Sequence, residues 1–240
     1  MNWKVPRMWE GGDVWIIGGG PSVTAQFDIP DEVVQKVLSG ASPLSVYSPY
    51  MEAIHDKHVI GVNVAFMLGD WIDMVFFGDG GFFQRYKLQL AKFPGLKVTC
   101  HNGASGDKWV KFLGRDGRKP RGISTSPNLV SWNSNSGAAA ISVAAWSGAK
   151  RIILLGFDMS LSGQNRQHWH NIYGRGVFDP KDHKKMRKLP FQRHLRGFAA
   201  IKEDANKMGI SIYNVSPNSA ITEFPKVTLT EMFDILKNNG

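Results

Sequence analysis

Three consecutive glycines, Gly18, Gly19 and Gly20, end a run of apolar residues, and Pro21 and Ser22 follow them directly. Glycines after a strand let backbone N–H groups approach an anion, and the N-terminus of a following helix adds partial positive charge. Pro21 suits a first helical turn because its missing N–H costs nothing there, and Ser22 can offer a hydroxyl group. A tight strand-to-helix turn without a ligand has the same pattern, so other parts of the chain must decide between the two interpretations.

A histidine and several basic side chains in the second half of the chain can do chemistry on a phosphate-linked substrate. His194 is a candidate general base because an unperturbed imidazole titrates near neutrality, although a histidine at a helix start can equally satisfy local backbone groups. The candidate partners for a leaving phosphate or an anionic acceptor are Arg166, His168, His170, Arg175 and the lysines within 184–188. A solvated basic loop has the same composition, so both interpretations stay open for each of these residues.

Metal-ligating patterns are weak in this sequence. His168 and His170 can ligate zinc together with His183, but they lack the nearby cysteine pair of a structural zinc site. Asp79 has no second carboxylate two residues away, so Mg²⁺ is possible but not expected. We therefore predict no metal site and no required cofactor.

Alternating apolar runs and helical patterns predict the elements that position these residues. The expected strands are 14–17, 59–64, 74–77, 96–99, 151–155 and 210–215, and the expected helices are 31–38, 82–91, 136–149, 194–208 and 229–237. Continuous apolar strands between helices predict an α/β fold, namely a Rossmann-like, mostly parallel sheet with helices on both faces. We expect a single domain over 1–240, with irregular structure at 39–57, a polar surface loop or hairpin at 101–135, and a basic lid insertion at about 160–193 that faces an acceptor.

Polar or glycine residues follow most of the predicted strands. They are the glycine motif at 18–22, Asn63, Asp79, Asp158 and the turn at 216–219. Each alone is more often a cap or a turn residue than a ligand. Because ligands of parallel sheets bind beyond the carboxyl ends of the strands, their coincidence predicts a nucleotide-type site along one edge.

The composition restricts the partners and the compartment. A formal net charge of +9 and a pI of about 9.7 favour an anionic substrate or a polyanionic partner such as nucleic acid. The single cysteine, Cys100, excludes an internal disulfide framework and fits a reducing compartment, most simply the cytoplasm. No apolar run is long enough to span a membrane, so we expect no membrane span.

Five motifs in unbroken order resemble those of bacterial sialyltransferases of the Campylobacter type and of the related motility-accessory-factor and pterin-diphosphokinase-like proteins. The motifs are GGGPSV, VNVAF, DMVFFGDGGFFQRY, NSGAAAISVAAWSGAKRIILLGFDMSLSG and YNVSPNSAI. The likeness extends over most of 14–220. It implies a single-domain GT-A-like variant of the Rossmann-like fold, although fold-level analogy is a weaker argument for chemistry than for fold.

The resemblance implies a role for several residues. The donor-binding residues that it implies, taken with the strand-end positions, are Gly18, Gly19, Gly20, Pro21, Ser22, Asn63, Asp79, Ser136, Gly137, Phe157, Asp158, Pro217, Asn218 and Ser219. His194 falls close to the catalytic histidine of the family. Two tyrosines that stabilise the leaving phosphate in the family are replaced here by Ser160 and Arg166, so we expect Arg166 to serve through its charge, with help from His168, His170 or Tyr173.

The function that this resemblance implies is that of a glycosyltransferase, using a CMP- or UDP-linked donor, inverting and independent of metal. The acceptor hydroxyl belongs either to a glycan or to DNA that carries a hydroxymethylated pyrimidine, in which case Trp109, Trp132 and Trp169 can stack a displaced base. A DNA acceptor would suit an enzyme encoded by a phage and located in the host cytoplasm. Two alternatives stay open: an ATP- and Mg²⁺-dependent pterin-type diphosphokinase that uses Asp79 or Asp158, and a non-catalytic nucleotide- or nucleic-acid-binding module.

Overall fold

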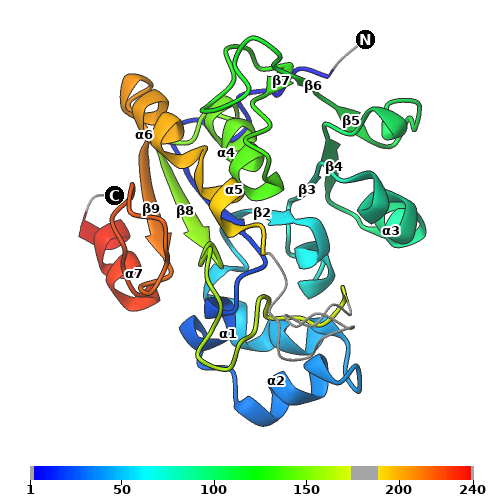
Figure 1. Cartoon of the computed structure of the whole chain (residues 1–240), viewed down its shortest axis with the longest axis vertical. Coiled ribbons are helices and arrows are strands. Elements are labelled where there is room, and N and C mark those ends of the chain that lie inside the picture. Colours follow the sequence, from blue (N-terminus) through cyan, green and yellow to red (C-terminus); the bar gives the residue numbers. More distant parts are fainter. Residues whose placement is uncertain (1–2, 174–188, 239–240) are drawn as a thin grey trace.

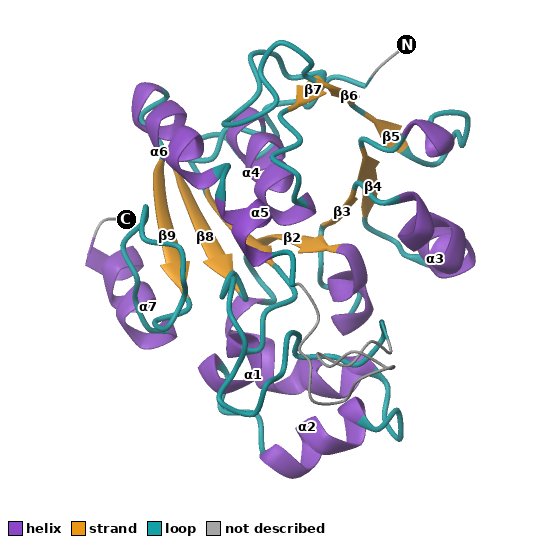
Figure 2. Cartoon of the chain, in the orientation of Figure 1, coloured by secondary structure: helices purple, strands orange, loops and turns teal. Residues whose placement is uncertain are grey.

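The computed structural model describes residues 3–173 and 189–238, and its centre is a seven-stranded parallel sheet. The strand order is β5-β4-β3-β2-β1-β8-β9. The strands are β1 (Asp13–Ile17), β2 (His58–Val62), β3 (Met74–Phe77), β4 (Leu96–Thr99), β5 (Lys111–Phe112), β8 (Arg151–Leu155) and β9 (Ser211–Val215). Figure 2 shows the progressive twist of these strands from β9 to β5.

The strand order reverses beside β1. From β1 the chain adds β2, β3, β4 and β5 on one side, and β8 and β9 follow on the other side. Val14 pairs with His58 of β2 and with Ile152 of β8, both in parallel register. Such a reversal leaves a crevice at the carboxyl ends of the two central strands, where open α/β sheets bind ligands.

Helices cover both faces of the sheet, as the continuous apolar strands predict. Successive residues of β1 pack into different clusters: Ile16 lies with α4 (Ser136–Trp146) and α6 (Phe198–Lys207), whereas Trp15 lies with α3 (Gly80–Lys92) and α7 (Leu229–Asn238). Both side chains are fully buried. The second face also carries α1 (Ser22–Gln26), α2 (Asp31–Leu38) and the 3₁₀ segments η1 (Leu44–Ile54) and η2 (Asn63–Leu68). The predicted α/β, Rossmann-like fold is confirmed.

The segment 101–135 is not the surface loop or hairpin that its polar composition predicts. It adds β5 to the main sheet, forms η3 (Asn102–Ala104), and pairs β6 (Gly114–Arg115) with β7 (Leu129–Val130) in parallel. Buried polar side chains stabilise this segment. The Asp116 carboxylate, for example, accepts hydrogen bonds from the N–H groups of Lys119 and Thr125. Buried hydrogen bonds of this kind allow a polar segment to fold into the body of a domain.

Two further predictions of local structure were wrong. The segment 39–57 contains η1, whose Tyr47 and Met51 are fully buried, so it is an ordered part of the second face. The helix expected at 194–208 is two helices, α5 (Phe191–Leu195) and α6. The helix is interrupted near Gly197, where the backbone lies so close to Asn133 that a Cβ would be 2.6 Å from its amide oxygen. The break turns α5 out of the line of α6, toward the carboxyl ends of the strands (Figure 1).

No helix in the described part of the chain combines the length and apolarity that crossing a bilayer requires. Cys100 is buried with a free thiol.

Candidate functional site

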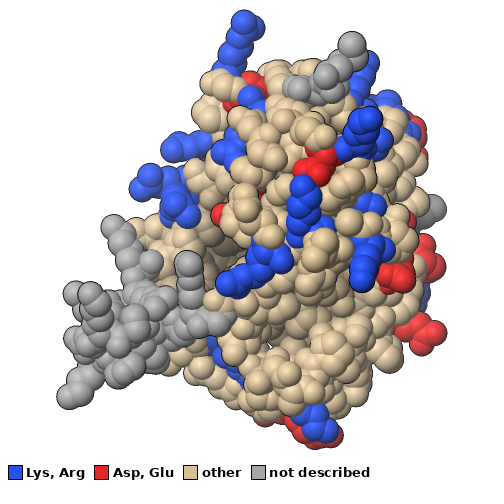
Figure 3. Space-filling model, turned by 90° about the vertical axis from the view of Figure 1, so that its right-hand side faces the viewer, with Lys and Arg blue, Asp and Glu red and all other residues tan. Residues whose placement is uncertain are grey.

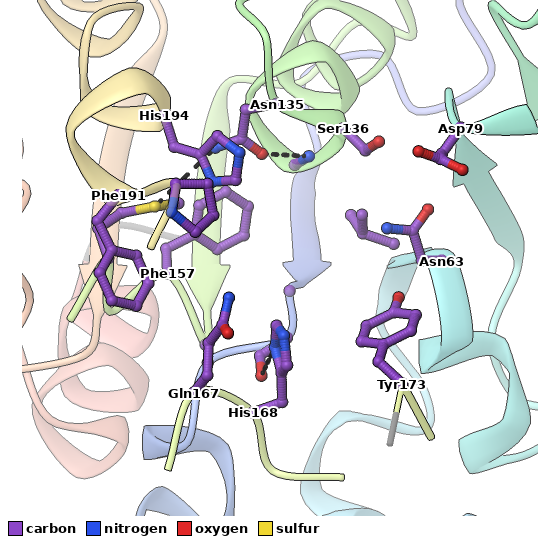
Figure 4. A pocket seen from close by; sticks show the side chains of 18 of the residues that line it. Asn63, Asp79, Asn135, Ser136, Phe157, Gln167, His168, Tyr173, Phe191 and His194 are labelled. Carbon is purple, nitrogen blue, oxygen red and sulfur yellow. Dashed lines mark hydrogen bonds between the residues drawn. The ribbon is translucent and has the colours of Figure 1, made fainter. Parts of the chain in front are cut away.

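A cavity of about 690 Å³ lies at the carboxyl ends of β1, β2, β3 and β8. The glycine turn after β1 lines its floor, and Asn63 and Asp79 follow β2 and β3 on one side. The N-terminus of α4, the turn after β8 and helix α5 line the other side, with segment 167–173 opposite α4 (Figure 4). The crevice predicted from the strand order is therefore open to a ligand.

Hydrogen bonds hold both the N–H groups and the carbonyl groups of the glycine turn. The N–H groups of Gly18 and Gly20 donate to the carbonyls of Leu155 and Gly156, each over 2.8 Å. The Gly18 carbonyl accepts from Trp169 Nε1 at 2.8 Å, and the Gly19 carbonyl accepts from the backbone of Trp169 at 3.2 Å. Two of the three glycine N–H groups thus extend the pairing with β8. The turn presents a narrow, immobilised backbone to the cavity.

Asp158 occupies the N-terminus of α1. Its carboxylate accepts from the Ser22 N–H at 3.1 Å and from Ser22 Oγ at 2.9 Å, and Ser22 Oγ lies 2.9 Å from Ser216 Oγ. Burial raises the pKa of Asp158, and the bonds from Ser22 oppose that rise. The glycine motif with Ser22 predicts a phosphate at this helix N-terminus, whereas the structure places the Asp158 carboxylate there. Pro21, Ser22 and Asp158 accordingly do not line the cavity.

The turn at 216–219 lies behind the cavity wall. Ser219 is buried, and its Oγ donates to the Phe157 carbonyl at 2.7 Å. Phe157 itself lines the cavity, whereas Pro217, Asn218 and Ser219 do not. This turn therefore contacts the wall rather than the cavity.

The N-terminus of α4 forms the upper wall. Asn135 caps the helix, because its Oδ1 accepts from the N–H groups of Gly137 at 2.9 Å and Ala138 at 3.4 Å. Ser136 lies on the cavity side (Figure 4), as the motif Ser136-Gly137 predicts. A Cβ on Gly137 would lie 2.9 Å from the Phe157 ring, so glycine lets α4 approach the turn after β8.

Three histidines line the cavity, the buried His170 and the half-buried His168 and His194, and none has a carboxylate partner in the described part of the chain. His168 and His170 stack with ring centroids 5.0 Å apart, and His168 Nδ1 lies 3.1 Å from the Gly19 carbonyl. Burial lowers the pKa of both. Burial also lowers the pKa of His194 to about 4, with smaller contributions from the charges of Arg193 and His168. All three imidazoles are neutral at physiological pH, which leaves each with a nitrogen lone pair.

This arrangement predicts that acid destabilises the protein before carboxylates are titrated. The unfolded chain takes up a proton on His194 near pH 6.5, whereas the folded chain resists it until about pH 4. The free energy of unfolding should therefore fall as the pH drops through that window, by up to about 1.4 kcal/mol per pH unit for this histidine. Urea unfolding at several pH values measures the slope. Replacing His194 by glutamine should make this slope shallower, and an unchanged slope in that variant contradicts the assignment.

The predicted site residues fall into two groups. Those that line the cavity are Gly18, Gly19, Gly20, Asn63, Asp79, Ser136, Gly137, Phe157, Ser160, His168, His170, Tyr173 and His194. Those that do not are Pro21, Ser22, Asp158, Arg166, Pro217, Asn218 and Ser219. Arg166 instead lies 3.7 Å from the Asp31 carboxylate. Arg175, His183 and the lysines within 184–188 lie outside the described residues, and in the described part no three His, Cys, Asp or Glu side chains gather as metal ligands.

The cavity also contains residues that our sequence analysis missed. They include Arg85, Tyr86, Asn135, Met159, Gln167, Phe191 and Arg193. Trp132, one of the three tryptophans expected to stack a base, lines the cavity as well. Asn135 had a local signal, because an asparagine before a small-residue helix is a favoured N-cap. No local sequence pattern identifies Arg85. It is an exposed residue of α3 and lines the cavity because the fold places that helix beside it.

Solved structures of similar fold are glycosyltransferases. No protein-family model and no curated protein sequence matches the chain. The MAf glycosyltransferase from Magnetospirillum magneticum AMB-1 aligns with a TM-score of 0.58 and 11% identity over 95% of this chain, which spans 36% of that protein. A CST-II sialyltransferase variant in complex with CMP aligns with a TM-score of 0.50 and 15% identity, over 90% of this chain and 86% of the other. The chain thus has the Rossmann-like fold of the MAf glycosyltransferase and the CST-II sialyltransferase.

Proposed function

We propose that this protein is a glycosyltransferase that moves a sugar from a nucleotide-sugar donor to an acceptor hydroxyl. The observation that carries the proposal is a neutral imidazole, that of His194, in a cavity at the strand reversal that also holds Arg85 and Arg193. A base and cations that balance a departing phosphate are what glycosyl transfer requires. The fold that the chain shares with two glycosyltransferases supports the same reading.

The cavity suits the donor in size and charge. Its volume lies within the range of sites for small ligands, roughly 300–1,000 Å³. Arg85 and Arg193 form no ion pair within residues 3–173 and 189–238, so both can bind phosphate oxygens. We propose a CMP- or UDP-linked donor, with Ser136 and the glycine turn beside it. Two arginines provide positive charge at the leaving group, and transfer is proposed to proceed without a metal ion.

In the proposed reaction His194 takes the proton of the acceptor hydroxyl as its oxygen attacks the anomeric carbon. The bond from that carbon to the phosphate oxygen breaks, and its electron pair leaves with the nucleotide. A single displacement inverts the anomeric configuration. The low pKa of His194 keeps the base unprotonated in the empty site, and a bound phosphate would raise it toward neutrality, where proton transfer is most efficient.

The acceptor is proposed to be anionic. Lys and Arg side chains are spread widely over the face shown in Figure 3, and the chain has a formal net charge of +9. A surface glycan with acidic groups and hydroxymethylated DNA both fit this charge. Steep loss of binding with added salt is expected for the DNA acceptor, because phosphate contacts release counterions.

Mass spectrometry of acceptors tests the proposal. The full chain is incubated with UDP-, GDP- and CMP-sugars, together with glycan acceptors or hydroxymethylated duplex DNA. Addition of one glycosyl residue, with release of the free nucleotide and without added Mg²⁺, is the expected result. Stabilisation by ATP and Mg²⁺ alone, with pyrophosphate transfer to a pterin, would instead support a diphosphokinase.

A further inference from the structure

One wall of the cavity presents the side-chain oxygens of Asn63 and Asp79, of which only Asp79 Oδ1 has a hydrogen-bond donor among the described residues. Asn63 follows β2 and Asp79 follows β3, and these strands pair directly, with Val62 opposite Phe76. Figure 4 shows both side chains on this wall, with the amide oxygen of Asn63 on the side of Asp79. Asp79 Oδ1 accepts from the Phe82 N–H at 3.0 Å, and the carboxylate has no ion-pair partner within the described ranges. Its second oxygen is available to a ligand.

The Asn63 side chain lies between Asp79 and Tyr173 (Figure 4). The Tyr173 hydroxyl lies below it (Figure 4), and a hydrogen bond with the Asn63 side chain opposes the rise that burial causes in the pKa of Tyr173. An amide N–H facing the phenol oxygen has this effect, and Figure 4 shows the amide oxygen on the side of Asp79. Oδ1 is buried and has no partner among the described residues. The backbone of Asn63 has a φ of 52°, an unusual conformation for a residue other than glycine.

An unpaired buried amide oxygen beside a carboxylate sets the chemistry of the group that fits there. Both oxygens can only accept hydrogen bonds, so the ligand must donate them. A sugar hydroxyl donates, and its burial would satisfy Asn63 Oδ1. A carboxylate on the sugar donates nothing and brings a second negative charge next to Asp79, which is unfavourable in a partly enclosed cavity.

We infer that the wall formed by Asn63 and Asp79 selects an uncharged, hydroxyl-rich donor sugar of the hexose type and rejects a sugar that carries a carboxylate. This inference rests on the proposed function and adds the class of sugar to it. Arg85 lies on α3, the helix that Asp79 caps, but neither Arg85 nor Arg193 forms an ion pair with Asp79. They are available to the phosphates of a nucleoside diphosphate, the usual carrier of neutral hexoses.

Matched donor pairs test the selectivity on the full chain. Calorimetry compares UDP-glucose with UDP-glucuronic acid, which differ only by a carboxylate in place of a hydroxymethyl group, and GDP-mannose with GDP-mannuronic acid. The neutral member of a pair should bind at least about tenfold more tightly, the ratio expected for a like charge a few ångströms away. Asp79→Asn keeps an oxygen for the Phe82 N–H, so α3 stays capped, and should reduce that ratio about tenfold. Asn63→Asp should increase the ratio of affinities for the neutral and the acidic donor, and aspartate tolerates the same backbone conformation.

Glu203→Gln removes a negative charge from an exposed site on α6 and should leave the ratio unchanged. Equal binding of both members of a pair, tighter binding of CMP-N-acetylneuraminic acid than of any neutral donor, or an unchanged ratio in Asp79→Asn would each overturn the inference. In all three cases donors still bind, so the proposed function stands. If no nucleotide sugar binds at all, the proposed function fails, and the inference fails with it.

Discussion

Replacement of His194 by alanine is expected to lower kcat for glycosyl transfer by about 100- to 10,000-fold, the usual contribution of a general base. Donor affinity should change little, because the imidazole acts on the acceptor hydroxyl rather than on the nucleotide. Steady-state kinetics of nucleotide release, together with calorimetric titration of the donor, separate the two quantities. Loss of donor binding without loss of kcat would assign His194 to the binding of the nucleotide.

The pH dependence of the wild-type protein provides an independent check on this residue. Burial and the neighbouring Arg193 lower the pKa of His194 to about 4 in the free protein, so the base is unprotonated at neutral pH. The acid limb of kcat/KM, which reports the free protein, should therefore lie below about pH 6, whereas an unperturbed imidazole titrates near 6.5. The control is His58→Gln, because His58 is exposed and does not line the cavity. This variant should leave both kcat and the acid limb unchanged.

Replacement of Gly20 by alanine is expected to lower the free energy of unfolding by about 2 to 4 kcal/mol, as forcing atoms into a packed site does. A Cβ at this position would overlap the Asp158 carboxylate and lie 2.6 Å from the Gly156 carbonyl. Neither neighbour can move freely, because Asp158 holds Ser22 and Gly156 accepts the Gly20 N–H. Urea unfolding measures the loss.

Gly163→Ala is the matched control for this prediction. A Cβ there meets no atom within 4 Å, and the same glycine-to-alanine change should alter stability by less than about 1 kcal/mol. In the double variant Gly20→Ala with Asp158→Ala, the two losses should be clearly less than additive, since removal of the carboxylate makes room for the new methyl group. Full additivity would show that the close approach of Gly20 and Asp158 does not limit stability.

Local patterns were sufficient for most of the sheet. The strands at 74–77, 96–99 and 151–155 have the predicted bounds, because strands covered on both faces are mostly apolar and such runs stand out in the sequence. Asp79 was also placed correctly before a helix, where its carboxylate caps α3. Polar segments were not predictable in this way. Asp116 and Asn133 are buried and bonded to groups elsewhere in the same polar segment, such as the N–H groups of Thr125 and Gly122, and composition alone does not distinguish this from a surface loop.

The sequence by itself determined the parallel α/β sheet and the glycine turn after β1, since both depend on residues that are adjacent in the chain. It also placed Asn63 and Asp79 directly after strands whose carboxyl ends meet at one edge of the sheet. Tertiary structure decided what the glycine motif contacts. The Asp158 carboxylate, 136 residues away from Ser22, occupies the N-terminus of α1 and leaves the glycines as a packed floor. It also brought Arg85 and Arg193 to the cavity, because the charge around a site depends on how distant helices pack and not on any local pattern.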